Sequence, residues 1–282
     1  MNNILIIGLG LIGGSIAKSL HTNNHELNIF AFDQNSSPIS IAMDEGIIKK
    51  EINIFDDFNS IYENEIDLII IATPGSVTKK ILLHFKEIGL FNSDDITITD
   101  TASSKSDMLD DFDNVSNLVL SHPMSGSDKA GYKAANNELY ENKKTIVLNP
   151  FSASDKHLQI VMNLWKLLGS TPYIMNPEDH DKAMAFASHL PHLISFSLLH
   201  SIMNQDDNNI NNFAAGGLKE FLRIAGSDPE MWSDIFNSNQ NNIIEALELF
   251  KDSLDEIRNK FSDKDELKEL INKIKQYKQN SF

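Results

Sequence analysis

Short apolar runs alternate with longer amphipathic stretches through the first half of the chain. Short apolar runs of this kind are typical of strands that are buried on both faces of a parallel sheet. The stretches between them have helical spacing, so the alternation predicts a doubly wound α/β domain. The runs fall at residues 4–7, 27–32, 67–72, 96–99, 118–120 and 145–148.

The pattern changes after Pro150, and the remaining residues are almost entirely helix-patterned. Residues 179–203 predict one long apolar helix, and Ser227-Asp228-Pro229 is typical of a helix start with proline in the first turn. We therefore predict two domains. Residues 1–152 form a Rossmann domain with a mostly parallel sheet, and residues 153–282 form an all-α domain.

Composition and charge narrow the classes of function. The chain has 282 residues, no cysteine and a formal net charge of −16. The lack of cysteine excludes disulfides, thiolate metal sites and a cysteine nucleophile. The negative charge argues against nucleic-acid binding, because phosphates would be repelled. An anionic small molecule would need a local cluster of cations.

The start of the chain does not suggest export, and its apolar stretches do not suggest membrane insertion. The start, Met-Asn-Asn-Ile-Leu-Ile-Ile, lacks the basic region and cleavage site of a signal peptide, and apolar stretches are too short to span a bilayer. We expect a cytoplasmic protein with no membrane partner.

A glycine-rich turn directly follows the first predicted strand. It has the GxGxxG spacing, with Gly8, Gly10 and Gly13 as its glycines. Here Gly8 would permit a tight turn, Gly10 would let the backbone approach a pyrophosphate, and Gly13 would let a helix pack closely on the strand. Leu11 and Ile12 lie within this turn, just before the helix expected from about Gly13, whose N-terminus favours an anion. These residues predict a dinucleotide site.

An acidic residue at the end of the second strand selects between cofactors. Asp33 lies twenty residues after Gly13, where an acid hydrogen-bonds the adenine ribose. It would repel a 2′-phosphate, so we expect NAD rather than NADP. Thr73 and Pro74 end the third strand at the same edge of the sheet and are expected beside the cofactor.

A histidine follows the fifth predicted strand. His122, within Ser121-His122-Pro123, is suited to act as a general base, although a capping histidine would have the same sequence. Ser103, just after the fourth strand, could orient His122 or a ligand, and could equally cap a helix.

The helical half contains two further candidate groups. His189 and His192 are three residues apart and share a helix face. No third potential ligand lies at a spacing typical of a metal site, so we expect no metal. Lys219 and Arg223 are four apart and can face one anion, or else form a solvated basic pair.

Taken in order, these motifs resemble those of the prephenate dehydrogenase family of tyrosine biosynthesis. The resemblance covers nearly the whole chain. Leu222, Ala215 and Ser125 depart from the family pattern, and these departures affect packing or loop shape rather than charge. The matching segments are Gly8–Ser15, Thr99–Lys105, Ser121–Gly126, Ser188–His192, Lys219–Ala225, and Ser227-Asp228-Pro229 with Trp232.

The resemblance implies an NAD-dependent oxidative decarboxylation of prephenate to 4-hydroxyphenylpyruvate by a homodimer that associates through its helical domain. By this resemblance His122 takes the proton of the ring hydroxyl, Ser103 positions His122 and the cofactor, and Arg223 pairs with a substrate carboxylate. His189, His192 and Lys219 would line the side-chain end of the substrate, with Lys219 coming from either subunit.

Other functions stay open from the sequence. Arogenate carries an amine where prephenate has a keto group; Ser127 is a neutral neighbour for it, but Asp128 is adjacent, so arogenate is an alternative substrate. A β-hydroxyacid dehydrogenase or imine reductase would use a lysine or another donor on the long helix, where this chain has histidines. A non-catalytic NAD-binding regulator would not need His122, Ser103 and Arg223.

Overall fold

The computed structural model describes the chain apart from residues 110, 113–114, 127–128, 206–213 and 282. Its first part is a five-stranded sheet in the order β3-β2-β1-β4-β5, in which every pair is parallel. The strands are β1 (Asn3–Ile7), β2 (Asn28–Phe32), β3 (Lys50–Glu51), β4 (Leu68–Ile71) and β5 (Thr97–Asp100).

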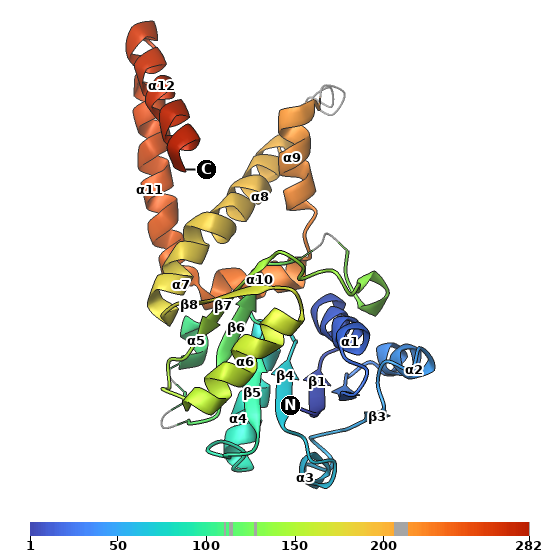
Figure 1. The fold of residues 1–282 in the computed structure, drawn as a ribbon. Helices are drawn as coiled ribbons and strands as arrows, with labels where there is room; N and C mark the ends of the chain where they lie inside the picture. The colour runs from blue at the N-terminus through green and yellow to red at the C-terminus, as the bar shows by residue number, and fades with distance from the viewer. Residues whose placement is uncertain (110, 113–114, 127–128, 206–213, 282) are drawn as a thin grey trace.

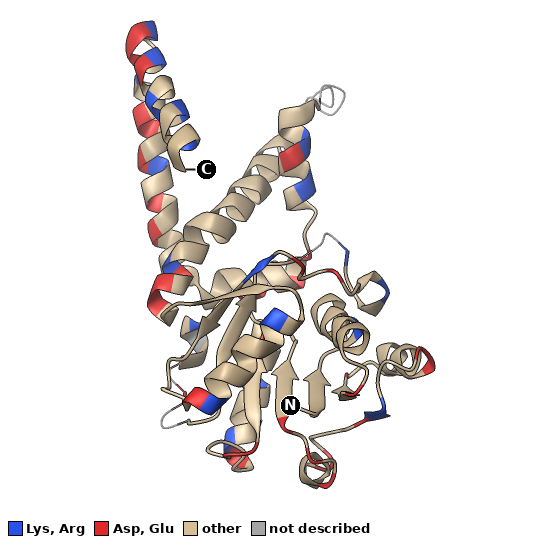
Figure 2. Cartoon of the chain, in the orientation of Figure 1, with Lys and Arg blue, Asp and Glu red and all other residues tan. Residues whose placement is uncertain are grey.

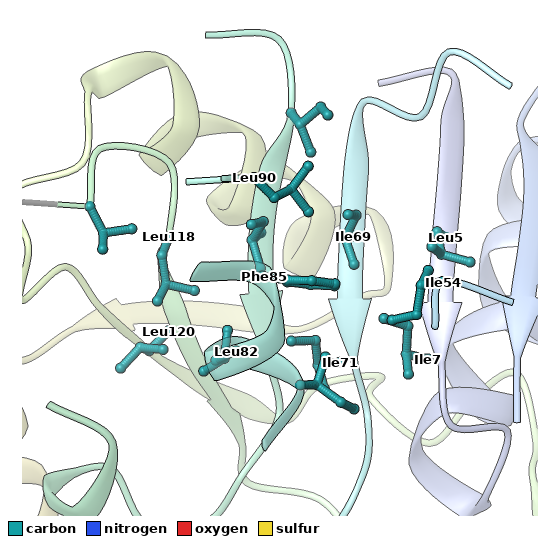
Figure 3. Packing of buried hydrophobic residues seen from close by; sticks show 14 of the residues in the cluster. Leu5, Ile7, Ile54, Ile69, Ile71, Leu82, Phe85, Leu90, Leu118 and Leu120 are labelled. Carbon is teal, nitrogen blue, oxygen red and sulfur yellow. The ribbon is translucent and has the colours of Figure 1, made fainter. Parts of the chain in front are cut away.

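Alternate residues of the central strands point to opposite faces of this sheet, and both faces are apolar. Leu5 and Ile7 of β1 belong to one buried cluster with Ile69 and Ile71 of β4. Figure 3 shows these side chains beside Phe85. Their neighbours in sequence belong to a second buried cluster. The continuous apolar runs in the sequence therefore reflect burial on both faces. The connecting helices are α1 (Leu11–Asn23), α2 (Ser36–Asp44), α3 (Asn59–Glu63) and α4 (Gly75–Glu87).

A second sheet has the order β6-β7-β8, with β6 antiparallel to β7 and β8 parallel to it. A parallel bridge pairs Ile98 of β5 with Leu118, which lies just before β6, and so connects the two sheets. Its elements are β6 (Leu120–Pro123), β7 (Lys144–Leu148) and β8 (Thr171–Ile174), with α5 (Ser106–Leu109), a 3₁₀ turn (Tyr132–Ala134) and α6 (Asp155–Leu167).

The packing of α6 and β8 differs from the sequence prediction for residues after 152. The pattern indicated helices there, but residues 171–174 form a strand that pairs with β7, and Trp165 of α6 is fully buried in the core of the first part. The prediction missed β8 because its residues are mostly exposed and show no strong alternation. We therefore propose that the domain boundary lies between β8 and α7 rather than at residue 152.

The rest of the described chain is helical. Figure 1 shows two arms that project away from the sheets, one built from α8 and α9 and the other from α11 and α12, with α10 lying between them and the sheets. A π-helical turn (Ala185–His189) joins α7 to α8 without a break. The helices are α7 (Pro177–Met184), α8 (Leu190–Met203), α9 (Gly216–Ala225), α10 (Pro229–Ser238), α11 (Gln240–Asn259) and α12 (Lys264–Ser281).

The start of α10 agrees with the sequence prediction. The carboxylate of Asp228 accepts a hydrogen bond from the backbone nitrogen of Met231 at 2.9 Å, and Pro229 occupies the first turn. None of the helices in the described ranges is both long and apolar enough to cross a membrane. The cytoplasmic location stays a prediction.

Candidate active site

A cavity of about 650 Å³ lies where the first sheet, the second sheet and α10 meet. Its walls come from the carboxyl ends of β1, β4, β5 and β6, which is the edge where ligands bind in open α/β sheets. The helical part closes it. Among its lining residues are Gly10, Thr73, Ser103 and His122 from the sheets, and His192, Arg223, Trp232 and Asp234 from the helices.

Steric contacts in the glycine turn explain two of its three glycines. Gly8 has a φ of +94°, and a side chain there would lie 2.6 Å from the carbonyl oxygen of Ala72. A Cβ on Gly13 would lie only 1.9 Å from the carbonyl oxygen of Gly8. A Cβ on Gly10 would meet no atom within 4 Å, because Gly10 faces the cavity. The turn thus leaves open space at the N-terminus of α1, as a pyrophosphate requires.

Asp33 supports the glycine turn. Its carboxylate accepts hydrogen bonds from the backbone nitrogens of Leu9 at 2.7 Å and Asn35 at 2.8 Å. Each carboxylate oxygen can accept a further bond, so this geometry leaves room for a ribose hydroxyl. Asp33 is not among the described residues that line the cavity.

His122 lies within β6, not after it, and only 8% of its surface is exposed. Its Nδ1 is 2.8 Å from Nε2 of His180. Burial lowers the pKa of His122 well below its ordinary value, and the neighbouring His180 and Lys105 add to this shift. The ring is therefore neutral near neutral pH. Since Nδ1 is bonded to His180, Nε2 is the nitrogen that can meet a ligand in the cavity.

A buried ion pair fixes the strand that carries His122. The ammonium group of Lys105 lies 2.5 Å from the carboxylate of Asp100 and donates to the carbonyl oxygen of Ser121 at 2.7 Å. Asp100 also accepts from the backbone nitrogen of Ser121 at 3.1 Å. Burial lowers the pKa of Lys105, although the contact with Asp100 opposes this. These bonds tie the ends of β5 and β6 together.

An aromatic pair forms the helical wall. The rings of His192 and Trp232 stack with centroids 3.7 Å apart and an angle of 21° between the planes. His192 donates its Nδ1–H to the carbonyl oxygen of Ser188 at 2.9 Å, which orients the ring. Arg223 reaches the cavity from α9, and its guanidinium lies 3.3 Å from the carboxylate of Glu220. A cation and a hydrogen-bonding ring therefore line the same cavity as His122.

Comparisons with known proteins identify this architecture. Residues 16–174 match the family model for the prephenate dehydrogenase nucleotide-binding domain, and residues 176–276 match the model for the prephenate dehydrogenase dimerization domain. The chain belongs to the prephenate dehydrogenase family. This membership makes it an oxidoreductase, and it confirms the resemblance seen in the sequence.

Individual relatives agree over nearly the whole chain. Prephenate dehydrogenase of Bacillus subtilis is 33% identical over 91% of this chain and 69% of its own length. Cyclohexadienyl dehydrogenase of Zymomonas mobilis is 26% identical over 93% and 89%. The structure of prephenate dehydrogenase from Aquifex aeolicus with hydroxyphenyl propionate and NAD+ has a TM-score of 0.90 and 32% identity, covering 99% of this chain and 98% of that one. The TM-score shows that this solved structure shares the fold of the present chain.

The structure brings most of the predicted site residues of this family member to one cavity. The ones that line it are Gly10, Leu11, Ile12, Thr73, Pro74, Ser103, His122, His192 and Arg223. Gly8, Gly13 and Asp33 shape the glycine turn behind it. Ser127 lies outside the described residues.

Three predicted roles stay predictions, because the described cavity lining does not show them. His189 is 1% exposed and lies behind the described lining, with Nδ1 3.1 Å from the amide nitrogen of Asn239. Lys219 is exposed and is not among the described residues that line the cavity with Arg223. Ser103 lines the cavity, and among the described residues no hydrogen bond joins it to His122, whose Nδ1 is bonded to His180.

The sequence analysis missed His180 and Asp181. Both are fully buried at the start of α7, where the sequence reads Asn176-Pro177-Glu178-Asp179-His180-Asp181. By itself, that pattern indicates only a polar helix start. A histidine beside an acid is a common surface pair, so the sequence contains no signal that these two side chains point inward.

Proposed function

We propose that this protein catalyses the NAD-dependent oxidative decarboxylation of prephenate to 4-hydroxyphenylpyruvate. The observation that carries the proposal is that the glycine turn and a buried neutral histidine, His122, face one cavity. A cofactor and a base must meet in this way for the hydroxyl-bearing carbon of a substrate to be oxidised.

The residues at the sheet edge fit a dinucleotide. Gly10 leaves space beside the N-terminus of α1, and Leu11, Ile12, Thr73 and Pro74 line the same wall. We propose that they hold NAD, with Asp33 near the adenine ribose. The related Aquifex aeolicus structure contains NAD+. When bound, this cofactor supplies the hydride acceptor.

His122 performs the proton step in this proposal. Its Nε2 accepts the proton of the substrate ring hydroxyl while the carbon bearing that hydroxyl loses a hydride. The ring carboxylate then leaves as carbon dioxide, the ring becomes aromatic, and the proton returns to the phenol oxygen. Burial of His122 excludes water from the reacting hydroxyl. Ser103 lines the same cavity and would help to place the cofactor and the substrate.

Cations and hydrogen-bond donors on the helical wall would hold the substrate. We propose that Arg223 exchanges its contact with Glu220 for a substrate carboxylate, because a guanidinium binds carboxylates with two parallel bonds. His192 would contact the side-chain end of the substrate, and Ser127 would contact it from the loop after β6. His189 would support this wall from behind, and Lys219 would come from a partner subunit.

The described acids favour prephenate over arogenate. Asp228 and Asp234 line the cavity, but Asp228 caps α10, and Asp234 accepts a hydrogen bond from the hydroxyl of Ser76 at 2.7 Å. Neither carboxylate is free to pair with a substrate amine without giving up its present partner.

Turnover with defined substrates tests this function. We expect NADH absorbance to rise when the protein is mixed with NAD+ and prephenate, and 4-hydroxyphenylpyruvate to accumulate in equal amount. Arogenate and NADP+ in place of prephenate and NAD+ should give lower kcat/KM. A protein that is folded but forms no NADH with either substrate would not have this function, and a preference for arogenate would correct the substrate.

We also propose that the chain forms a homodimer through its projecting arms. Figure 2 shows that α8 carries no Lys, Arg, Asp or Glu. The arms also expose several large apolar side chains, which is typical of interaction surfaces, and residues 176–276 match a dimerization domain. A second copy would cover this surface. The exposed apolar side chains of the arms include Met203, Phe221, Ile244, Leu249, Leu254, Phe261, Ile271, Ile274 and Tyr277.

Mixing two inactive variants tests both the dimer and the placement of Lys219. If Lys219 acts on the partner's substrate, a dimer of one Lys219→Ala chain and one Arg223→Ala chain has one intact site and one doubly altered site. Random pairing should then restore about a quarter of wild-type activity. Light scattering should show twice the mass of one chain. A monomer, or a mixture no more active than either variant, would contradict this arrangement.

A further inference from the structure

Three buried side chains form a continuous line of hydrogen bonds behind the cavity. The carboxylate of Asp181 lies 2.6 Å from Nδ1 of His180, and Nε2 of His180 lies 2.8 Å from Nδ1 of His122. His180 and Asp181 are fully buried, and only His122 reaches the cavity. The line therefore connects an interior carboxylate to the proposed base.

We infer that His180 and Asp181 are positioning residues that fix the tautomer of His122, so that its Nε2 carries no proton and is ready to accept one. This inference rests on the proposed function, because His122 acts as the proton acceptor only in that reaction. The two residues touch neither substrate nor cofactor; they act through His122.

The charge state of Asp181 determines which atom donates and which accepts in each of these hydrogen bonds. Its carboxylate accepts from the backbone nitrogens of Lys105 at 3.1 Å and Ser106 at 2.7 Å, and also contacts the hydroxyl of Ser106. Burial alone would raise the pKa of Asp181, but the hydrogen bonds from His180 and Ser106 outweigh it and lower the pKa. Asp181 is therefore an anion that can only accept.

An anionic Asp181 determines the rest of the line. Nδ1 of His180 must donate to it, so a neutral His180 has Nε2 as its acceptor. That acceptor takes the Nδ1–H of His122. A neutral imidazole carries one proton, so Nε2 of His122 retains a lone pair. With both nitrogens of His180 protonated, its Nε2–H would donate to Nδ1 of His122 and the proton of His122 would lie on Nε2, so the two arrangements differ in the tautomer of His122.

Two opposing influences act on the proton that His122 accepts: burial and the neighbouring His180 and Lys105 hold the pKa of His122 low, whereas Asp181 supplies a negative charge behind it. Lys105 and Asp100 compensate each other at 2.5 Å, which leaves the charge of Asp181 uncompensated among these buried groups. A proton arriving at Nε2 of His122 introduces a positive charge that the line of hydrogen bonds connects to that carboxylate. Such a buried carboxylate both orients a histidine and stabilises its imidazolium form.

The line also joins the two parts of the chain. His122 lies in β6, within the match to the nucleotide-binding model, whereas His180 and Asp181 lie in α7, within the match to the dimerization model. Asp181 holds the start of α5 through its bonds to Lys105 and Ser106. The orientation of His122 thus depends on how α7 docks against the sheets.

Nitrogen NMR of the free protein tests the tautomer without using the reaction. In protein labelled with ¹⁵N-histidine, His122 is assigned by the signals that disappear in His122→Asn. We expect Nε2 of His122 to show the shift of an unprotonated nitrogen, and Nδ1 that of a protonated one. A protonated Nε2 in the wild type near neutral pH would overturn the inference, whether or not the protein turns over prephenate.

Kinetics of two variants and a matched control supply the second readout. His180→Gln and Asp181→Asn should each lower kcat about 100-fold, with KM for prephenate and NAD+ within about threefold. His157→Gln changes a second buried histidine, which bonds Thr97 at 2.8 Å outside the described cavity lining, and should retain kcat. A folded His180→Gln protein with wild-type kcat would overturn the inference.

The amide of Asp181→Asn gives a further spectroscopic expectation. It can donate to Nδ1 of His180, which would reverse the line and place the proton of His122 on Nε2. We expect the corresponding nitrogen shifts to exchange in this variant. Retention of the wild-type tautomer in folded Asp181→Asn would show that the carboxylate does not set it.

Discussion

Replacing His122 with asparagine should lower kcat about 1,000-fold while leaving NAD+ binding within about threefold, because positioned acid–base groups contribute about 10²–10⁴ in rate. Asparagine is smaller than histidine and has no nitrogen that can take a proton near neutral pH. The residual rate would come from positioning by the rest of the cavity. Steady-state NADH formation gives kcat, and quenching of protein fluorescence gives the NAD+ dissociation constant.

The loss of kcat can be assigned to the missing base only if the NAD+ dissociation constant and the unfolding temperature of the variant stay near their wild-type values. His122 is 8% exposed, so the substitution leaves a small gap beside His180, and the unfolding temperature must be measured in parallel. A folded His122→Asn enzyme with kcat within tenfold of wild type would mean that another group takes the proton.

Replacing Gly13 with alanine should weaken NAD+ binding at least 100-fold and also lower the unfolding temperature. The added Cβ would lie 1.9 Å from the carbonyl oxygen of Gly8, so the turn or α1 must move. Overpacking of this kind costs about 1–3 kcal/mol or more, and the contact here is with backbone that cannot rotate away. Calorimetric titration with NAD+ and thermal unfolding measure the two effects.

Gly10→Ala is the matched comparison, because its Cβ would meet no atom of the protein within 4 Å. We expect it to unfold at the wild-type temperature and still bind NAD+ weakly, since the new methyl group occupies the space a pyrophosphate needs. Equal destabilisation by the two alanines would contradict the steric explanation, and unchanged NAD+ affinity in both would place the cofactor elsewhere.

The sequence was most informative where a local rule fixes both structure and chemistry. The runs that became β1 and β4 are apolar throughout, because both faces of the sheet are covered, and few arrangements besides a buried parallel strand require such a run. The GxGxxG turn is similar, since sterics at Gly8 and Gly13 demand glycine. Both features were therefore predicted at the correct places.

The sequence was least informative where tertiary packing determines whether a strand forms or a side chain is buried. β8 is exposed along most of its length and exists because it pairs with β7. His180 and Asp181 look like ordinary residues of a first helical turn, and only the docking of α7 buries them against Lys105. Lys219 and Arg223 share helical spacing, but spacing alone does not show which residue reaches a cavity or which copy of the chain supplies it.

The π-helical turn at residues 185–189 sets the phase of everything that follows it in α8. An α-helix turns about 100° per residue, and a π turn accommodates one residue more than an α turn. If the same residues formed a regular α-helix, with no residue removed, α8 would be rotated by about that angle. His192 would leave the face of Trp232, and the uncharged surface of α8 would turn with it. The extra residue therefore sets the orientation of the cavity wall and of the association surface together, and any rotation of α8 at this turn would move both.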